Sequence, residues 1–244
     1  MMGLLSVIEP ATIDEALSND GWILAMQEEL NQFQRNDVWD LVPKLHHKNI
    51  IGTKWVFKNK LNEQGELVKN KARLVSQVYS QQEGIDYTET FAPVARLEVM
   101  RLLLSYAVNH DIILYQMDVK SAFLNGVISE EVYVKKPPGF EDLKYPDHVY
   151  KLKKSLYGLK QTHSTWYDKS NFLIKNDFKR GQLDTTLFRR TLEKDILVVQ
   201  IYVDDIIFGS TNASLCKEFS KLMQDKFEMS MMGELKFFLG IQIN

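Results

Sequence analysis

The spacing of apolar side chains along the chain predicts four helices. In each of them apolar residues recur every three or four positions, which is the repeat of a helix with one buried face. Asp20 stands where it can cap the first turn of the first helix. The expected helices cover residues 20–36, 97–109 and 164–176, and a further helix carries Leu215, Phe219, Leu222 and Met223.

Other stretches have the two-residue alternation of strands. We expect a hairpin at residues 54–75, because Asn62-Glu63-Gln64-Gly65 supplies turn residues between two alternating runs. One strand has Lys54, Lys58 and Lys60 on one face, and the return strand has Lys69, Lys71 and Arg73 on one face. Further strands are expected at 112–119, 196–203, 206–210 and 233–243. Because strands and helices do not alternate strictly, the pattern favours an α+β fold with an antiparallel sheet.

Composition narrows the class of protein. The 244 residues are 45% hydrophobic and 25% charged, which excludes collagen-like and wholly disordered chains. This length allows one large domain or two small ones. The single Cys216 excludes an intramolecular disulfide and a cysteine-cluster metal site. No apolar run reaches the roughly 18 residues that cross a bilayer, so a soluble intracellular protein of cytoplasm or nucleus is expected, without a membrane partner.

The charge distribution is more informative than the net charge of −2. Residues 1–42 contain eight acids and one base, residues 44–80 contain eight bases and two acids, and residues 135–169 contain eight bases and four acids. Two basic blocks can form a phosphate-binding footprint. A solvated lysine surface is the alternative, and it is the commoner origin of such blocks.

An acidic pair lies between two apolar strands. Tyr202-Val203-Asp204-Asp205 falls between runs of β-forming residues, so the two carboxylates are expected in a tight hairpin turn. Aspartate is also a common turn residue without any further role. Asp118 ends the apolar strand at 112–117, and if that strand pairs with the hairpin, two or three carboxylates gather in one place. Such a cluster needs a cation, and Mg²⁺ prefers oxygen ligands.

Several ordered segments resemble one family. They include IGTKWVFKNKLNEQGELVKNKARLV (51–75), LYQMDVKSAFLNG (114–126), LYGLKQ (156–161) and QIYVDDIIFGST (200–211). Together they resemble the reverse transcriptase domain of copia-type LTR-retrotransposon Pol polyproteins. The resemblance implies a right-hand polymerase with fingers and palm, an antiparallel palm sheet packed on helices, and a truncated or absent thumb. We expect one domain over 1–244, with the N-terminal helix and fingers in about 1–100, and the palm, an interleaved fingers segment and a primer-holding hairpin in about 101–244.

The resemblance also implies the site and its ligands. Asp118 is expected to be the first metal-binding carboxylate, and Asp204 and Asp205 the turn pair, with Asp204 the closer metal ligand and Val119 beside Asp118 in the metal site. Two Mg²⁺ ions are implied, with Mn²⁺ as a substitute. The implied partners are an RNA or DNA template with its primer and deoxynucleoside triphosphates. The implied reaction is the RNA-directed addition of deoxynucleotides to a primer.

Six further residues receive roles from the resemblance. Tyr202 is expected at the primer end and Phe123 as a gate against a ribose 2′-hydroxyl, although Phe123 alone would be interpreted as a core aromatic. Lys71 and Arg73 are expected to grip the triphosphate, with a charged exposed strand face as the alternative. Gly158 and Gln161 are expected against template and incoming base, with a turn glycine and a surface amide as the alternatives.

The sequence departs from the family pattern at four places. Residues 162–165 replace a stretch that contains Pro and Arg, and the helix after Trp166 has one residue fewer, which rotates later positions by about 100°. Val78 stands where the family has Gly, so strain is expected if that position needs a positive φ. The chain ends at Asn244, which predicts a truncated copy. Three interpretations therefore stay open: an active polymerase domain, a non-catalytic nucleic-acid-binding remnant, and a fragment with no nucleic-acid role.

Overall fold

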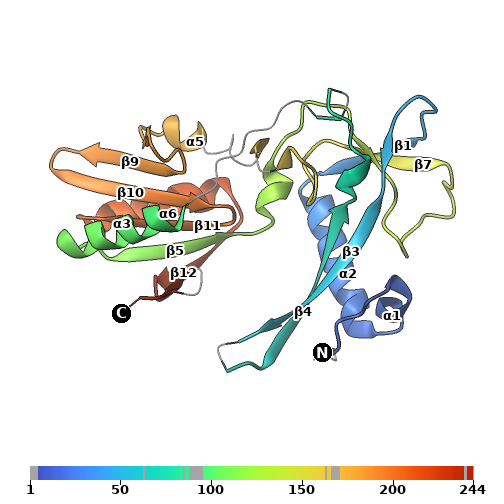
Figure 1. Cartoon of the computed structure of the whole chain (residues 1–244), viewed down its shortest axis with the longest axis horizontal. Helices are drawn as coiled ribbons and strands as arrows, with labels where there is room; N and C mark the ends of the chain where they lie inside the picture. Colours follow the sequence, from blue (N-terminus) through green and yellow to red (C-terminus); the bar gives the residue numbers. More distant parts are fainter. Residues whose placement is uncertain are drawn as a thin grey trace. The chain divides into compact units, whose positions relative to one another are not determined.

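The chain forms two compact units (Figure 1). The computed structural model describes residues 5–62, 64–84, 86–87, 96–162, 164–165, 171–238 and 241–243. The first unit consists of Met1–Thr90 and Phe123–Thr165, and the second of Phe91–Ala122 and Trp166–Asn244. Each unit is therefore built from two separate stretches of the sequence.

The first unit contains a helix packed on a long hairpin. Helix α2 (Asp20–Arg35) follows the short α1 (Ile13–Leu17), and its cap is Asn19, whose side chain accepts a hydrogen bond from the Gly21 N–H. The expected cap, Asp20, is instead the first helical residue. The hairpin consists of β3 (Thr53–Leu61) and β4 (Leu67–Ser76). Its apolar face packs on α2 and forms a core with Trp22, Phe33, Trp55 and Leu74.

A second, four-stranded sheet completes the first unit. Its strand order is β1-β7-β6-β2. The strands are β1 (Trp39–Pro43), β2 (Ile50–Ile51), β6 (Tyr133–Val134) and β7 (His148–Leu152), and β2 pairs with β6 in parallel. Two short 3-10 helices are η1 (Val78–Ser80) and η2 (Ala122–Asn125), the latter directly after β5 (Leu114–Val119) in the chain.

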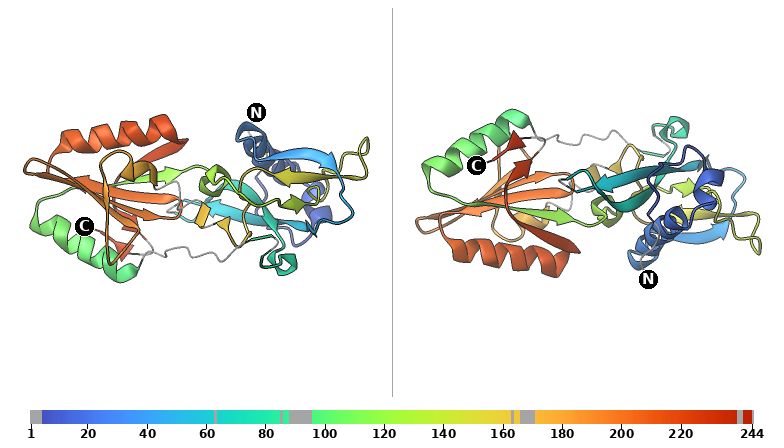
Figure 2. Two further views of the ribbon diagram at one scale, coloured as in Figure 1. Left: turned by 90° about the horizontal axis from the view of Figure 1, so that it is seen from above. Right: turned by 90° about the horizontal axis from the view of Figure 1, so that it is seen from below.

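The second unit is a six-stranded antiparallel sheet with a helix on each face (Figure 2). The strand order is β12-β5-β11-β10-β9-β8, and every pairing is antiparallel. The remaining strands are β8 (Lys179–Arg180), β9 (Leu187–Leu192), β10 (Asp195–Tyr202), β11 (Asp205–Ser210), β12 (Met229–Glu234) and the separate pair β13 (Phe237–Phe238) and β14 (Ile241–Gln242). The helices are α3 (Leu97–Asn109), the short α5 (Asn171–Ile174) and α6 (Ala213–Lys226).

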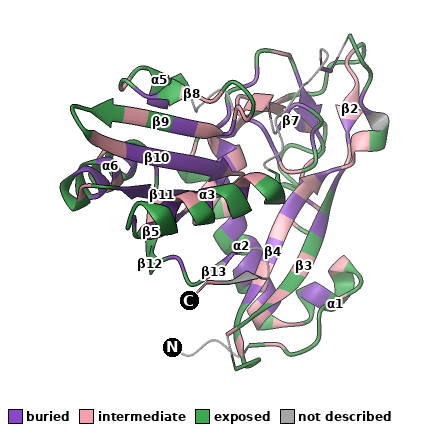
Figure 3. Ribbon diagram, turned by 60° about the vertical axis from the view of Figure 1, so that its left-hand side comes forward, coloured by how far each residue is buried: buried purple, intermediate pink, exposed green. Residues whose placement is uncertain are grey.

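Residue alternation along the strands explains how both helices are held. Leu114, Val198 and Ile207 point to the face covered by α3, where they pack with Met100 and Leu103. On the other face Phe208 contacts Phe219 of α6, with ring centroids 4.8 Å apart. The central strands β10 and β11 are consequently buried over most of their length (Figure 3).

Most of the expected elements are confirmed, as is the α+β class with its antiparallel sheet. Of the helix expected at 164–176, the structure describes only residues 164–165 and 171–176, and α5 lies within the latter; His163 and Trp166 lie outside the described residues. The strain expected at Val78 is absent, because Val78 starts η1 and is not among the described residues with a positive φ. No helix in the described part of the chain is long and apolar enough to span a membrane.

Candidate active site

Four polar side chains form one row across the end of the six-stranded sheet. The register pairs Tyr202 of β10 with Asp205 of β11, Asp205 with Asp118 of β5, and Asp118 with Ser230 of β12. Residues that lie directly opposite each other on neighbouring strands point to the same face, with Cβ atoms about 4.5–5.5 Å apart. The predicted pairing of the Asp118 strand with the acidic hairpin is therefore confirmed.

The hairpin that carries the acidic pair has a strained two-residue turn. Tyr202 pairs with Asp205, so Val203 and Asp204 alone make the turn. Val203 has a φ of 53°, a conformation that costs energy in a β-branched residue. The Asp204 carbonyl accepts a hydrogen bond of 2.8 Å from the Val119 N–H, which ties the turn to β5. Strained backbone of this kind is concentrated at functional sites.

Two other residues of β5 and its end define the surroundings of the row. The side-chain amide of Gln116 donates a hydrogen bond of 2.7 Å to Asp205 Oδ1. Lys120 is the cation next to the row in sequence, and its ammonium pairs with Glu228 at 2.9 Å. This lysine charge is thus already compensated by an acid other than Asp118 or Asp205.

The row offers oxygen ligands of the kind that a hard divalent cation prefers. Asp118 and Asp205 are half-buried and directly opposite, and Asp204 adjoins them in the turn. Val119 could contribute only its backbone carbonyl, because its side chain is a buried hydrocarbon without a ligand atom. Among the described residues, however, no group of three or more His, Cys, Asp or Glu side chains lies close enough to hold a metal ion. The structure thus brings two of the expected carboxylates opposite each other without a three-carboxylate cluster.

The expected cationic residues lie in the first unit, on the hairpin of β3 and β4. The register pairs Lys58 with Lys71 and Lys60 with Lys69, so like charges lie directly opposite each other on one face. Arg73 shares this face, opposite Val56. Opposed like charges destabilise a strand pair unless an anion neutralises them. We call Lys54, Lys58, Lys60, Lys69, Lys71 and Arg73 the cationic face.

Acidic residues of the N-terminal segment compensate part of this charge. Glu9 lies 3.5 Å from the Lys58 ammonium, and Glu28 of α2 lies 2.7 Å from that of Lys69. Lys54 and Lys60 enter no ion pair within the described residues. The cationic face is therefore only partly neutralised.

Two lysines of the second basic block, Lys151 and Lys153, also pair with acids, as does Lys48 of the first block. Lys151 and Lys48 both bond to the Glu131 carboxylate, and together they lower its pKa to about 2. Lys153 lies 2.8 Å from the carboxylates of both Asp37 and Asp40. For these lysines the ordinary interpretation as a charged, solvated surface is sufficient.

An aromatic ring that the sequence analysis did not single out joins two of the expected substrate residues. Tyr157 packs edge-on against Phe123, with centroids 5.2 Å apart, and the Arg73 guanidinium lies 5.2 Å from the centre of the same ring. Phe123 is half-buried, so it is not the plain core aromatic of the alternative interpretation. The only sequence signal for Tyr157 was its place in the LYGLKQ segment.

Gly158 and Gln161 are explained by packing in this structure. Gly158 has a φ of 92°, and a Cβ there would lie 2.6 Å from the Ser76 carbonyl oxygen, so only glycine fits. Gln161 is only 2% exposed, and the surface amide of the alternative interpretation is therefore wrong. Its amide bonds to the Gln81 side chain and to the Asp86 carbonyl.

A buried acid lies between α2 and β4. Burial raises the pKa of Glu29 to about 7, against the opposing effects of the Leu74 N–H, which donates to it at 3.4 Å, and of the Lys71 and Arg73 charges. Sequence reasoning missed this group, because Glu29 stands next to the exposed Glu28 in a polar stretch of α2.

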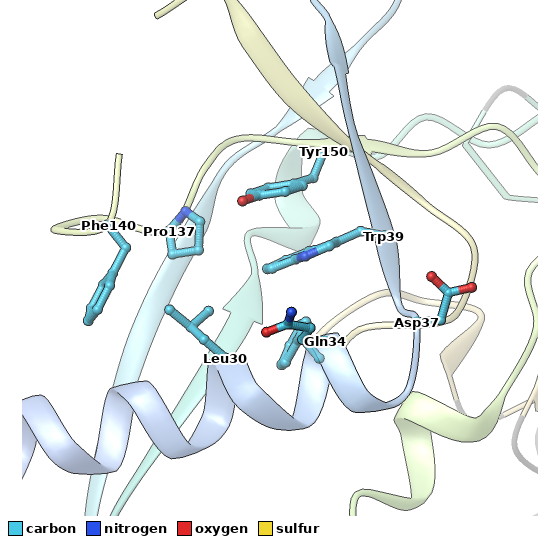
Figure 4. A pocket seen from close by; sticks show the side chains of 8 residues that line it. Leu30, Gln34, Asp37, Trp39, Pro137, Phe140 and Tyr150 are labelled. Atoms are coloured by element: carbon cyan, nitrogen blue, oxygen red, sulfur yellow. The ribbon is translucent and has the colours of Figure 1, made fainter. Parts of the chain in front are cut away.

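The first unit also contains a pocket of about 350 Å³ (Figure 4). Trp39 and Tyr150 stack there with ring centroids 4.1 Å apart, and Leu30, Pro137 and Phe140 complete the apolar wall. None of the residues expected from the sequence to bind substrate or metal lines it. It therefore does not extend the site described above.

The family match and the similarity to known proteins point to the same family. Residues 36–244 match the family described as reverse transcriptase (RNA-dependent DNA polymerase). The chain is 39% identical over 243 residues to the retrovirus-related Pol polyprotein from transposon RE1 of Arabidopsis thaliana, covering 99% of this chain and 17% of that protein. It is 36% identical over 240 residues to the corresponding polyprotein from transposon TNT 1-94 of Nicotiana tabacum, covering 96% of this chain and 18% of that protein.

The chain thus spans less than a fifth of the length of these relatives. Among solved structures, an apo telomerase of Candida tropicalis is similar to 86% of this chain and 55% of its own, with a TM-score of 0.43 and 9% sequence identity. Similarity at that level adds nothing to the assignment.

Proposed function

Because the chain belongs to the reverse transcriptase (RNA-dependent DNA polymerase) family of copia-type Pol polyproteins, we propose that it extends a primer with deoxynucleotides under the direction of an RNA or DNA template. The observation that carries the proposal is the register of the six-stranded sheet. Asp118 and Asp205 come from stretches 87 residues apart in sequence, yet they lie directly opposite each other. A fold that needed these carboxylates only as turn and strand-end residues would not require that pairing.

The carboxylates are the groups that would hold the metal. Asp118 and Asp205 would present oxygen ligands from neighbouring strands, and Asp204 would be the nearest further carboxylate in sequence, in the turn between β10 and β11. Two Mg²⁺ bound there would supply charge neutralisation on the triphosphate and a lower pKa for the primer hydroxyl. The work of the chain itself is positioning: the β5–β11 pairing and the hydrogen bond from Val119 to Asp204 keep the three carboxylates at one end of the sheet.

Residues of the first unit are proposed to bind the nucleotide. Lys71 and Arg73 supply positive charge for the triphosphate, and Arg73 forms no ion pair within the described residues. Phe123, supported edge-on by Tyr157, would exclude a ribose 2′-hydroxyl. Tyr202 lies in the same row as Asp205 and would contact the primer end. Gly158 and Gln161 would act indirectly, by holding the loop beside β4.

Primer extension with Mg²⁺ and deoxynucleoside triphosphates tests the proposal. Asp118→Asn and Asp205→Asn each remove one charge from the row at nearly unchanged volume, and each is expected to reduce extension at least 100-fold, since the loss of a charged group that stabilises a transition state costs several kcal/mol. The matched control is Glu193→Gln, which removes an exposed acid from the turn between β9 and β10. Equal extension by the parent and Asp118→Asn would refute the proposal.

A second candidate is a nucleic-acid-binding domain without polymerase activity. Two observations favour it: the cationic face opposes lysines of like charge, and the described residues contain no three-carboxylate cluster able to hold a metal. In this case a primer–template would bind with an affinity that falls steeply as salt rises, and no extension would follow.

The salt dependence of binding identifies the surface involved. Lys60→Gln is expected to reduce the slope of log K against log salt by about 1, because one phosphate contact is lost. Lys153→Gln is the matched control, since this lysine is already paired with Asp37 and Asp40. Equal effects of the two substitutions would exclude the cationic face as the binding surface.

A further inference from the structure

We propose that Gln116 is a positioning residue that orients the Asp205 carboxylate for a cation by donating a hydrogen bond to one of its oxygens. The inference rests on the proposed function, in which Asp205 is a metal ligand. Its basis is the hydrogen bond of 2.7 Å from Gln116 Nε2 to Asp205 Oδ1.

The register of the sheet explains why Gln116 reaches this carboxylate. Gln116 lies two residues before Asp118 on β5, so the two side chains share a face. Because Asp118 is opposite Asp205 and Gln116 is opposite Ile207, Gln116 is the diagonal neighbour of Asp205. Long side chains reach diagonal neighbours on the same face of a sheet.

The neighbouring strand leaves room for this amide. On the β12 side Gln116 is paired with Gly233, which follows a register shift after Met231. Gly233 has a φ of 87°, and a Cβ placed on it would meet no atom within 4 Å. No side chain from β12 therefore competes for the Gln116 amide at this position.

Gln116 also marks the limit of the apolar core. Leu114 and Ile207 belong to the cluster that packs under α3, whereas Asp118 and Asp205 lie beyond Gln116 at the end of the sheet. A methionine or leucine would fit the core side equally well, but it would give Asp205 no hydrogen-bond donor.

A neutral amide suits a carboxylate that has to bind a metal. A lysine or arginine at this place would pair with Asp205 and compete with a divalent cation. A glutamate would repel the Asp205 carboxylate. The amide donates a hydrogen bond to one carboxylate oxygen without neutralising the charge, so the side chain is oriented before the cation arrives. Groups that orient metal ligands in this way typically change metal affinity by about 10- to 100-fold when they are removed.

Binding of Mn²⁺ to the protein, followed by electron paramagnetic resonance in the absence of nucleic acid, tests the inference without using activity. Gln116→Met keeps the length of the side chain and removes the donor, and it is expected to weaken Mn²⁺ binding about tenfold. The matched control is Gln200→Met on β10, whose amide bonds to Thr186 and not to a carboxylate. Gln200→Met is expected to leave Mn²⁺ binding within about twofold of the parent, as the amide it removes orients no metal ligand.

The outcomes separate this inference from the proposed function. If Asp205→Asn abolishes Mn²⁺ binding and Gln116→Met does not weaken it, the inference is refuted and the metal site stands. If Asp205→Asn binds Mn²⁺ like the parent, both the inference about Gln116 and the proposed metal site are refuted. Equal weakening by Gln116→Met and Gln200→Met would show a general loss of packing and would also refute the inference. Should Gln116→Met not fold, Gln116→Asn carries the same test, because its amide is one methylene too short to reach Asp205.

Discussion

The buried carboxyl of Glu29 makes the stability of the first unit depend on pH. Glu29 is 9% exposed between α2 and β4, and burial raises its pKa from 4.5 to about 7. The folded state therefore holds this proton more tightly than the unfolded state does. Between pH 4.5 and pH 7 the unfolded chain ionises Glu29 while the folded chain keeps it protonated, so the free energy of unfolding falls as pH rises through this window and levels off above it.

The substitution Glu29→Gln removes this dependence. The amide has the shape of the protonated carboxyl and keeps an acceptor for the Leu74 N–H. The pKa difference corresponds to about 3 kcal/mol in total, of which about 2.5 kcal/mol develops between pH 5 and pH 8. We therefore expect the difference in the free energy of unfolding, variant minus parent, to be about 2.5 kcal/mol larger at pH 8 than at pH 5.

Urea unfolding at several pH values, followed by tryptophan fluorescence, measures the difference. Three of the four tryptophans (Trp22, Trp39 and Trp55) belong to the first unit, so most of the signal reports on the part of the chain that contains Glu29. Subtracting parent from variant at each pH cancels the titration of every other group. The matched control is Glu28→Gln, which removes the adjacent, half-exposed acid that pairs with Lys69. A difference that does not change with pH, or an equal gain in the control, would refute the argument.

Two backbone positions give further predictions. Gly158→Ala is expected to lower the free energy of unfolding by about 3 kcal/mol, because its Cβ would lie 2.6 Å from a backbone oxygen of β4 at a φ of 92°. The control is Gly65→Ala, at a φ of 79° where an added Cβ would meet no atom within 4 Å, and it should lower the free energy of unfolding by only about 1 kcal/mol. Equal losses of stability in the two variants, measured by urea unfolding, would contradict the close approach at Gly158. Val203→Gly is expected to raise the free energy of unfolding by about 1 kcal/mol, because glycine adopts a φ of 53° without strain. A thermal unfolding midpoint at or below that of the parent would contradict strain in the turn.

Local pattern was sufficient for the elements. Apolar residues at helical spacing predicted α2 and α3 within one or two residues of their observed ends, and turn residues at 62–65 predicted the hairpin of β3 and β4. These features depend on neighbours in sequence, and the same neighbours decide backbone conformation in the fold. The cap at Asn19 shows the limit, since adjacent Asn and Asp can both cap a helix.

The site was predictable only as a set of candidates. Sequence alone identified Asp118, Asp204 and Asp205 as acids at the ends of apolar strands. That Asp118 lies opposite Asp205 depends on strand order and register, which are fixed by how both faces of the sheet pack on α3 and α6. A register shift of one residue would have turned Asp118 to the other face.

Burial was the other property that sequence left undecided. Glu28 and Glu29 are identical residues side by side, yet one is exposed in an ion pair and the other is buried with a raised pKa. Gln116 is likewise an ordinary strand residue in the sequence. In the fold, the bulge in β12 and the register with β11 let its amide donate a hydrogen bond to the Asp205 carboxylate. The sequence determined which segments form helices and strands, because that choice is local. Which polar groups meet and which lose water follows from the packing of the folded chain, because those contacts join residues that are distant in sequence.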